Sequence, residues 1–289
     1  MRIGGTVALV TGSERGLGAA LARVLARRGA RVVASGLARE PLERLRATIE
    51  ADGGQALALP CDVCDQAQIA SLVTEVTRVY GRIDLLVNNA GVTAGGDIRL
   101  LADADWDRVL QVNLLGSARM VRAVLPGMLA RRRGAILNVA SAAGLAAPAL
   151  WIPYAASKFA LIGFSEGLHA ALGPHGIVVS VACPMWIETD MLTSVTPSLG
   201  DPPPAPAAVV RAPRGWAWLT AHVPGRHMTP ETAAQRMVRG IERERFMIYT
   251  HRMTHLLVAA RAVAPELFAR LWRRVNEFDE RRHRQRSPR

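Results

Sequence analysis

The feature that most constrains the fold is the regular alternation of short apolar runs with amphipathic helical patterns from the N-terminus to residue 183. Residues 7–10, 31–34, 85–87 and 177–181 are rich in Val, Leu, Ile and Ala and have the length of buried strands. Apolar residues recur at helical spacing between these runs. Strands that alternate with helices form right-handed β-α-β units, which build a parallel sheet with helices on both faces. The sequence therefore predicts an α/β fold with a doubly wound parallel sheet in a single domain.

The pattern changes in the C-terminal third of the chain. Residues 190–230 are rich in proline and predict a long loop, which in a compact domain is expected to act as a substrate loop or lid. A helix and a short strand are then predicted to complete a catalytic domain of residues 1–250. Residues 251–289 keep a helical apolar pattern that is interrupted at Pro265, and they are rich in arginine. We therefore expect a C-terminal helical extension.

The composition sets limits on the partners. A formal net charge of +12 invites a nucleic-acid interpretation, but nine arginines and four acids fall in residues 261–289 without any zinc-finger, RNP or basic-zipper pattern. We therefore expect no specific nucleic-acid partner. The pair Cys61 and Cys64 has no second pair to complete a metal site, so no metal is predicted. The chain shows no leader and no long apolar run, which predicts a cytoplasmic protein.

A glycine-rich turn joins the first predicted strand to the first predicted helix. Residues 11–18 read T-G-S-E-R-G-L-G. Glycines at such a turn let the backbone bend sharply and approach a pyrophosphate at the helix N-terminus, although a tight turn without a ligand also needs glycine. The turn predicts a dinucleotide site that contains Gly12, Arg15, Gly16, Leu17 and Gly18.

The end of the second predicted strand bears on the choice of dinucleotide. An acidic residue near residues 35–36 would receive the ribose hydroxyls of NAD, but the first acid after that strand is Glu40. Arg15 and Arg39 flank the site instead. Because a guanidinium suits the 2′-phosphate of NADP, NADP is the predicted cofactor and NAD the alternative. In the other interpretation, Arg39 only caps the exposed start of a helix.

Tyr154 and Lys158 are four residues apart in a predicted helix, and Lys158 is the only lysine of the chain. Residues at this spacing share a helix face. An ammonium near a phenol favours the phenolate and lowers the pKa of the tyrosine, which would make a proton donor and acceptor near neutral pH. A composition bias toward arginine would also explain a lone lysine.

Together these motifs resemble the classical short-chain dehydrogenase/reductase family over about residues 3–250. Residues 11–18 fit its cofactor turn, T-G-x-x-x-G-x-G, and residues 88–91 read N-N-A-G, its motif at the end of the fourth strand. The resemblance implies a Rossmann-type fold, a nicotinamide cofactor and a homodimer or homotetramer. The matching residues are Asp62, Val63, Asn89, Ala90 and Gly91 for the cofactor, and Asn113, Ser141, Tyr154 and Lys158 for catalysis.

The resemblance also implies a role for each catalytic residue. Tyr154 would donate a proton to a carbonyl oxygen or take one from an alcohol, and Ser141 would hydrogen-bond that oxygen. Lys158 would lower the pKa of Tyr154 and hold the ribose of the nicotinamide, so Tyr154 and Lys158 belong to the cofactor site as well. Asn113 would hold a water that connects Lys158 to solvent.

The chain departs from the family pattern after the sixth predicted strand, where Pro184 is followed by Met185 instead of glycine. Because the rest of the motif still fits, the backbone of Ile187 and the hydroxyl of Thr189 are expected to hold the nicotinamide carboxamide, and Pro184 is expected to belong to the same cofactor site. A methionine at this place narrows the space beside the nicotinamide. Met185 and Trp186 therefore form either a wall of the substrate pocket or part of the core beneath the loop.

The segment before Tyr154 has no fixed charge and is expected to form another wall, with Ala143, Leu150 and Trp151 in contact with substrate. An apolar wall predicts an apolar or aromatic ketone or secondary alcohol. Two alternatives stay open. One is a catalytically silent NAD(P)-binding module. The other is a membrane-surface enzyme for lipidic substrates, anchored by its arginine-rich extension, although packing of that extension on protein is favoured.

Overall fold

A computed structural model describes residues 1–187 and 228–284, with the side chains of the last helix described as far as residue 276. Thr189 and almost all of the predicted substrate loop, residues 190–230, lie outside the described residues.

Seven parallel strands form one sheet in the order β3-β2-β1-β4-β5-β6-β7. The chain reverses its direction of travel across the sheet between β1 and β4, and in open α/β sheets the carboxyl ends of the strands form a binding crevice at such a point. The strands are β1 (Val7–Thr11), β2 (Arg31–Gly36), β3 (Gln55–Pro60), β4 (Leu85–Asn88), β5 (Gly134–Val139), β6 (Ile177–Cys183) and β7 (Met247–Tyr249).

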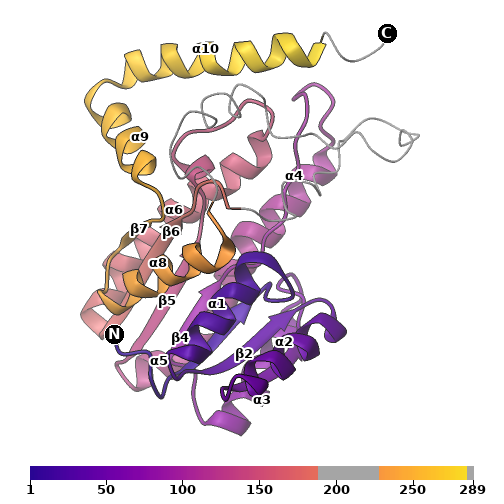
Figure 1. The fold of residues 1–289 in the computed structure, drawn as a ribbon, viewed down its shortest axis with the longest axis vertical. Coiled ribbons are helices and arrows are strands. Elements are labelled where there is room, and N and C mark those ends of the chain that lie inside the picture. Colours follow the sequence, from indigo (N-terminus) through magenta and orange to yellow (C-terminus); the bar gives the residue numbers. More distant parts are fainter. Residues whose placement is uncertain (188–227, 285–289) are drawn as a thin grey trace.

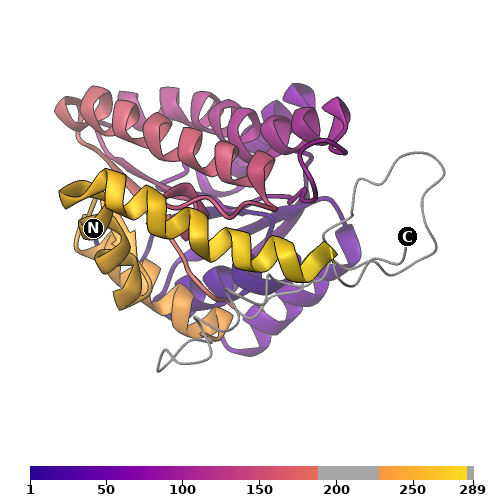
Figure 2. The ribbon, with the colours of Figure 1, turned by 90° about the horizontal axis from the view of Figure 1, so that it is seen from above.

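Helices cover both faces of the sheet, as Figure 2 shows from above. Ala8 and Val10 of β1 belong to the apolar cluster under one helical layer, whereas Val7 and Leu9 belong to the cluster under the other. This alternation follows from the two-residue period of a strand, and it confirms the doubly wound α/β fold. One layer holds α1 (Gly16–Arg27), α2 (Arg39–Ala51) and α8 (Pro230–Glu242), and the other holds α3 (Gln66–Tyr80), α4 (Asp103–Leu110), α5 (Ser117–Ala130) and α6 (Ile152–Leu172).

The C-terminal extension forms α9 (Arg252–Val263) and α10 (Pro265–Arg284), and α10 lies across the carboxyl end of the sheet (Figure 1). It packs on the segment that precedes α6. Nε1 of Trp272 donates a hydrogen bond of 2.7 Å to the carbonyl oxygen of Ala147, and the side chain of Asn276 accepts one of 2.9 Å from the N–H of Ala149. The extension thus packs on its own catalytic domain, as the favoured interpretation expects. None of the described helices has the length and apolar character that a membrane span requires.

Candidate active site

The glycine-rich turn lies at the carboxyl end of β1. Gly12 and Gly16 have φ values of 61° and 55°, which favour glycine, and a Cβ at Gly12 would lie 2.7 Å from the Cα of Ala90. At Gly18, a Cβ would lie 2.1 Å from the carbonyl oxygen of Gly12 and 2.5 Å from Nδ2 of Asn89. Backbone atoms and the hydrogen-bonded side-chain amide of Asn89 fill this space. The turn therefore has the close packing that a pyrophosphate site at the N-terminus of α1 needs.

Thr11 and Asn89 connect this turn to the end of β4. The side-chain amide of Asn89 donates to the carbonyl oxygens of Thr11 and Gly12, at 3.0 and 2.9 Å. The hydroxyl of Thr11 accepts hydrogen bonds from the N–H groups of Asn89 and Ala90, at 3.0 and 3.1 Å. Two motifs that are far apart in the sequence therefore form one hydrogen-bonded unit.

The other residues that were expected to contact the cofactor occupy the same edge of the sheet. Asp62 and Val63 follow the carboxyl end of β3. Gly91 follows β4, and a Cβ there would lie 3.3 Å from Oδ1 of Asn113 and 3.6 Å from Nζ of Lys158. The N-N-A-G segment thus connects the turn after β1 with Asn113 and Lys158, two of the four catalytic candidates.

An acidic side chain that the sequence analysis missed reaches the end of β2. Glu14 belongs to the turn after β1, and its carboxylate accepts hydrogen bonds from the N–H groups of Leu37 and Ala38. A Cβ at Gly36 would overlap this carboxylate, so glycine makes room for it. The sequence indicated no acid at this site because Glu14 precedes β2 in the chain. The sequence feature that could have indicated this contact is the place of Glu14 two residues after Gly12, within the glycine-rich turn.

Arg15 and Arg39 lie where the sequence predicted them. Arg15 is the residue before α1 and Arg39 is the first residue of α2, and both are exposed. Within the described part of the chain, neither forms an ion pair. Leu17, in the first turn of α1, is half-buried and packs against the apolar core. Two free guanidinium groups are thus available near the end of β2.

Tyr154 and Lys158 share one face of α6, as their spacing predicts. Nζ of Lys158 lies 5.7 Å from the centroid of the Tyr154 ring and donates a hydrogen bond of 2.8 Å to the carbonyl oxygen of Val139. Tyr154 is 7% exposed and Lys158 is 4% exposed. The phenol and the ammonium are therefore held together out of contact with bulk water.

The pKa values depart from the sequence-based expectation. Burial raises the pKa of Tyr154, and a hydrogen bond with Ser141 opposes the rise. Burial lowers the pKa of Lys158 to about 8. The expectation of a lowered pKa for Tyr154 is therefore wrong for this structure, because burial disfavours the charged form of the phenol and raises its pKa. Burial also raises the pKa of Cys183 to about 12, so this thiol stays neutral beside Lys158.

Asn113 lies in a π-helical turn, η1 (Gln111–Gly116), where the sequence pattern predicted a continuous helix. Its Oδ1 accepts a hydrogen bond of 2.8 Å from the N–H of Val92, and its Nδ2 donates to the carbonyl oxygen of Val92 and to Oγ of Ser157. The Ser157 hydroxyl in turn donates to the carbonyl oxygen of Tyr154, at 2.7 Å. Asn113 therefore fixes the turn of α6 that carries the phenol of Tyr154, and π-helical turns occur often at functional sites.

The apolar wall predicted before α6 is brought next to Tyr154. Ser141 begins the short 3-10 helix η2 (Ala142–Gly144) after β5, and its Oγ accepts a hydrogen bond of 3.1 Å from the N–H of Ala143. Ala143, Trp151 and Tyr154 belong to one small apolar cluster, in which the Trp151 ring meets the Tyr154 ring edge-on at 6.1 Å. The half-buried Leu150 directly precedes Trp151.

The second predicted wall follows β6. Met185 is buried, and its N–H donates a hydrogen bond of 3.3 Å to the hydroxyl of Thr250. Trp186 is half-buried, and its ring packs edge-on against His251 at 5.2 Å. The left-handed backbone conformation, with φ of 51°, falls on Trp186 and not on Met185, so a methionine replaces the family's glycine without backbone strain. Ile187 is half-buried beside this wall.

Comparisons with known proteins agree with this geometry. A family model described as short chain dehydrogenase matches residues 6–200. The 3-oxoacyl-(acyl-carrier-protein) reductase FabG of Escherichia coli is 35% identical over 196 residues, which cover 68% of this chain and 79% of that protein. A short-chain dehydrogenase/reductase of Burkholderia phymatum, solved with NAD, has a TM-score of 0.81 at 30% identity and covers 92% of this chain and 96% of its own. A variant of the actinorhodin polyketide ketoreductase, solved with NADPH, has a TM-score of 0.72 at 36% identity, with coverages of 81% and 89%.

The match with the family model includes the glycine-rich turn and all four catalytic candidates. The reductase of Escherichia coli extends the likeness to a protein of known reaction class. The chain therefore belongs to the short-chain dehydrogenase/reductase family and is an NAD(P)-dependent oxidoreductase that acts on CH–OH and C=O groups.

Proposed function

We propose that this enzyme interconverts an apolar or aromatic ketone and its secondary alcohol, with Tyr154 as the proton donor and acceptor. The observation that carries the proposal is the burial of a phenol and an ammonium on one helix face, next to a turn that suits a dinucleotide. Gly91 connects the buried pair with the glycine-rich turn. It belongs to the N-N-A-G segment, which is hydrogen-bonded to that turn, and it lies against Asn113 and Lys158.

The side chains of this site are suited to proton transfer. When bound, the nicotinamide cofactor supplies or accepts the hydride. Burial raises the pKa of Tyr154, so the phenol is protonated at neutral pH and able to donate to a carbonyl oxygen. Proton transfer leaves a phenolate, and the ammonium of Lys158, charged below its pKa of about 8, stabilises it. The hydroxyl of Ser141 hydrogen-bonds the same substrate oxygen as negative charge develops there.

NADP is the cofactor that the charges near β2 favour. Arg15 and Arg39 have no ionic partner among the described residues, and a guanidinium binds a phosphate through two parallel hydrogen bonds. Glu14 opposes a phosphate by its charge, but its carboxylate is engaged by two backbone N–H groups. The NADPH complex of the actinorhodin ketoreductase supports this choice, and the NAD complex of the Burkholderia phymatum protein supports NAD as the alternative.

The walls near Tyr154 favour an apolar substrate. Ala143 and Trp151 form an apolar cluster with the catalytic tyrosine, and Trp186 adds a second aromatic surface after β6. An oxoacyl substrate, such as the one in the name of the Escherichia coli relative, would place an alkyl chain in the same surroundings. We further propose that residues 190–230 act as a substrate loop of a catalytic domain formed by residues 1–250, and that the enzyme is a homodimer or homotetramer.

A cofactor-consumption screen tests these proposals. Apolar ketones, aromatic ketones and small anionic oxo acids are each incubated with NADPH and with NADH. We expect turnover of apolar or aromatic ketones with NADPH, because the walls carry no fixed charge. A preference for small anionic oxo acids would contradict the substrate class. If no substrate gives more turnover than Tyr154→Phe, the chain is a silent binding module instead.

The same assay tests the role of Arg39. Replacing Arg39 with Ala removes a charged partner for a 2′-phosphate, a type of hydrogen bond that contributes about 1.5–3 kcal/mol. We expect the ratio of kcat/KM for NADPH to that for NADH to fall by about 10-fold to 100-fold. An unchanged ratio would show that Arg39 only begins α2, as the other interpretation of the sequence holds.

A further inference from the structure

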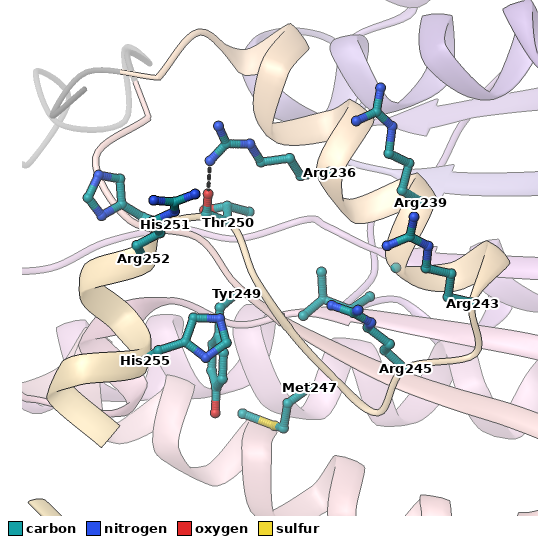
Figure 3. Close-up of a pocket in the computed structure, with 12 residues that line it drawn as sticks. Arg236, Arg239, Arg243, Arg245, Met247, Tyr249, Thr250, His251, Arg252 and His255 are labelled. Carbon is teal, nitrogen blue, oxygen red and sulfur yellow. Dashed lines mark hydrogen bonds between the residues drawn. The ribbon is translucent and has the colours of Figure 1, made fainter. Parts of the chain in front are cut away.

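Five arginines surround one cavity on the side of the molecule away from the cofactor turn. The cavity has a volume of about 260 Å³ and lies between α8, β7 and α9 (Figure 3). The cavity is separate from the turn after β1, because β4, β5 and β6 lie between β1 and β7 in the sheet. Its basic residues are Arg236, Arg239 and Arg243 of α8, Arg245 of the following turn, and Arg252 and His255 of α9.

The acidic and the basic side chains of α8 and of the turn after it lie on different sides of this segment. Glu231 pairs with Arg27 of α1, and Glu242 pairs with Arg28. Glu244, just after α8, pairs with the N-terminal amino group. The acids of this segment are thus already neutralised on the side that faces α1 and the N-terminus. Arginines at positions 236, 239 and 243 are spaced by three and four residues, which places them together on another face of the helix.

The arginines at the cavity lack any such neutralisation. Arg236 donates a hydrogen bond to the carbonyl oxygen of Thr250, which Figure 3 shows as a dashed line. Among the residues that the structure describes, the other four arginines form no ion pair and no acidic residue lines the cavity. Five like charges around one small space repel one another, so a multivalent anion would be favoured there.

We propose that this cavity binds a small anion that carries two or more phosphate groups. Guanidinium groups match phosphate through paired N–H donors, and those around the cavity come from three separate segments, so they approach an anion from different directions. The volume is below the roughly 300–1,000 Å³ of pockets for drug-sized ligands, so the cavity is too small to enclose a whole dinucleotide and suits a diphosphate group. Two of its lining residues reach the proposed substrate wall, because Thr250 accepts a hydrogen bond from Met185 and His251 packs against Trp186.

The test is calorimetric titration with inorganic pyrophosphate at constant ionic strength, with and without NADP. With NADP bound at the turn after β1, we expect saturable binding of pyrophosphate to one site per chain. The double variant Arg239→Gln, Arg243→Gln should weaken this binding at least 10-fold, because it removes two charges while keeping most of each side-chain stem. The variant Arg122→Gln, Arg133→Gln, which removes two exposed arginines of α5 and the turn before β5, should leave it unchanged.

Three results would overturn the proposal. One is the absence of saturable binding beyond that of sulfate at the same ionic strength. Another is binding that the Arg239→Gln, Arg243→Gln variant retains, which would place the anion elsewhere, such as the turn after β1. The third is equal weakening in both double variants, which would indicate a response to net charge alone. None of these readouts depends on turnover, so they stand apart from the test of the proposed reaction.

Discussion

The proposed cofactor end and the proposed substrate end of the active site are built by different means. At the cofactor end, two neighbouring strands end in motifs joined by four hydrogen bonds, with glycines where no side chain fits. At the substrate end, the wall before α6 is held by Trp272 and Asn276 of α10, which lie 125 and 127 residues further along the chain than their partners. The cofactor end therefore depends on backbone packing, and the substrate end depends on a late helix.

Under the proposed function, this difference would let one fold keep its cofactor site while its substrate changes. The match with the family model ends at residue 200, before α9 and α10 begin. Side-chain contacts from α10 to the backbone of the wall can be altered without touching the glycine-rich turn. Substitutions at the cofactor end should consequently change the cofactor Kd, and substitutions at the substrate end should change the KM for the ketone.

The largest loss of activity is expected from a substitution of Tyr154, which lies between the cofactor end and the substrate end. The variant Tyr154→Phe keeps the ring that packs on Trp151 and removes only the hydroxyl that carries the proton. Because general acid–base catalysis contributes about 10²- to 10⁴-fold, we expect the single-turnover rate to fall by about 10³-fold, with the cofactor Kd unchanged. Stopped-flow measurement of cofactor oxidation gives the rate. A fall of less than about 10-fold would show that another group moves the proton.

A smaller effect, confined to the cofactor end, is expected from Gly18→Ala. The added Cβ would lie 2.1 Å from the carbonyl oxygen of Gly12, so the turn must shift, and overpacking of this kind costs about 1–3 kcal/mol. We expect cofactor binding to weaken by about 5-fold to 150-fold, as measured by titration, and the Tm to fall. The control is Gly163→Ala, in open space on α6, which should stabilise the fold by about 0.5–1 kcal/mol. Equal effects of the two variants would refute the role of close packing at the turn.

The smallest kinetic change is expected from substitutions in α10 that loosen the wall at the substrate end. Trp272→Phe and Asn276→Ala each remove one hydrogen bond to the wall before α6, which contributes about 0.5–1.5 kcal/mol. Each should raise the KM for the ketone by about 2-fold to 10-fold and leave the cofactor Kd unchanged. Leu271→Ala, at an exposed site of the same helix, is the matched control and should have no effect. A change in the cofactor Kd as large as that in KM would mean that the two ends are not independent.

The sequence predicted the parts of the molecule that depend on local pattern. The alternation of strands and helices, the glycine-rich turn and the shared face of Tyr154 and Lys158 follow from spacing alone. Three features could not be predicted in this way. Glu14 reaches the end of β2 from another loop, the π-helical turn at Asn113 interrupts a continuous helical pattern, and α10 reaches the substrate wall over a long separation.

The pKa of Tyr154 was predicted in the wrong direction for a related reason. Spacing showed that an ammonium lies near the phenol, and the attraction between opposite charges suggested a lowered pKa. Burial of both groups is a property of the folded core, and it raises the pKa of Tyr154 while it lowers that of Lys158. Whether burial or the attraction between opposite charges decides the pKa depends on packing that residue spacing does not reveal.

The charge of Lys158 is the most direct test of this buried pair. Because Lys158 is the only lysine, protein labelled with carbon-13 lysine should give one Cε signal by NMR, whose shift follows loss of the proton as the pH is raised. Burial lowers the pKa of Lys158 to about 8, so the midpoint of the titration should lie near that pH. A pKa near 10.5, the ordinary value for lysine, would mean that the ammonium is exposed to water and that the buried pair does not form.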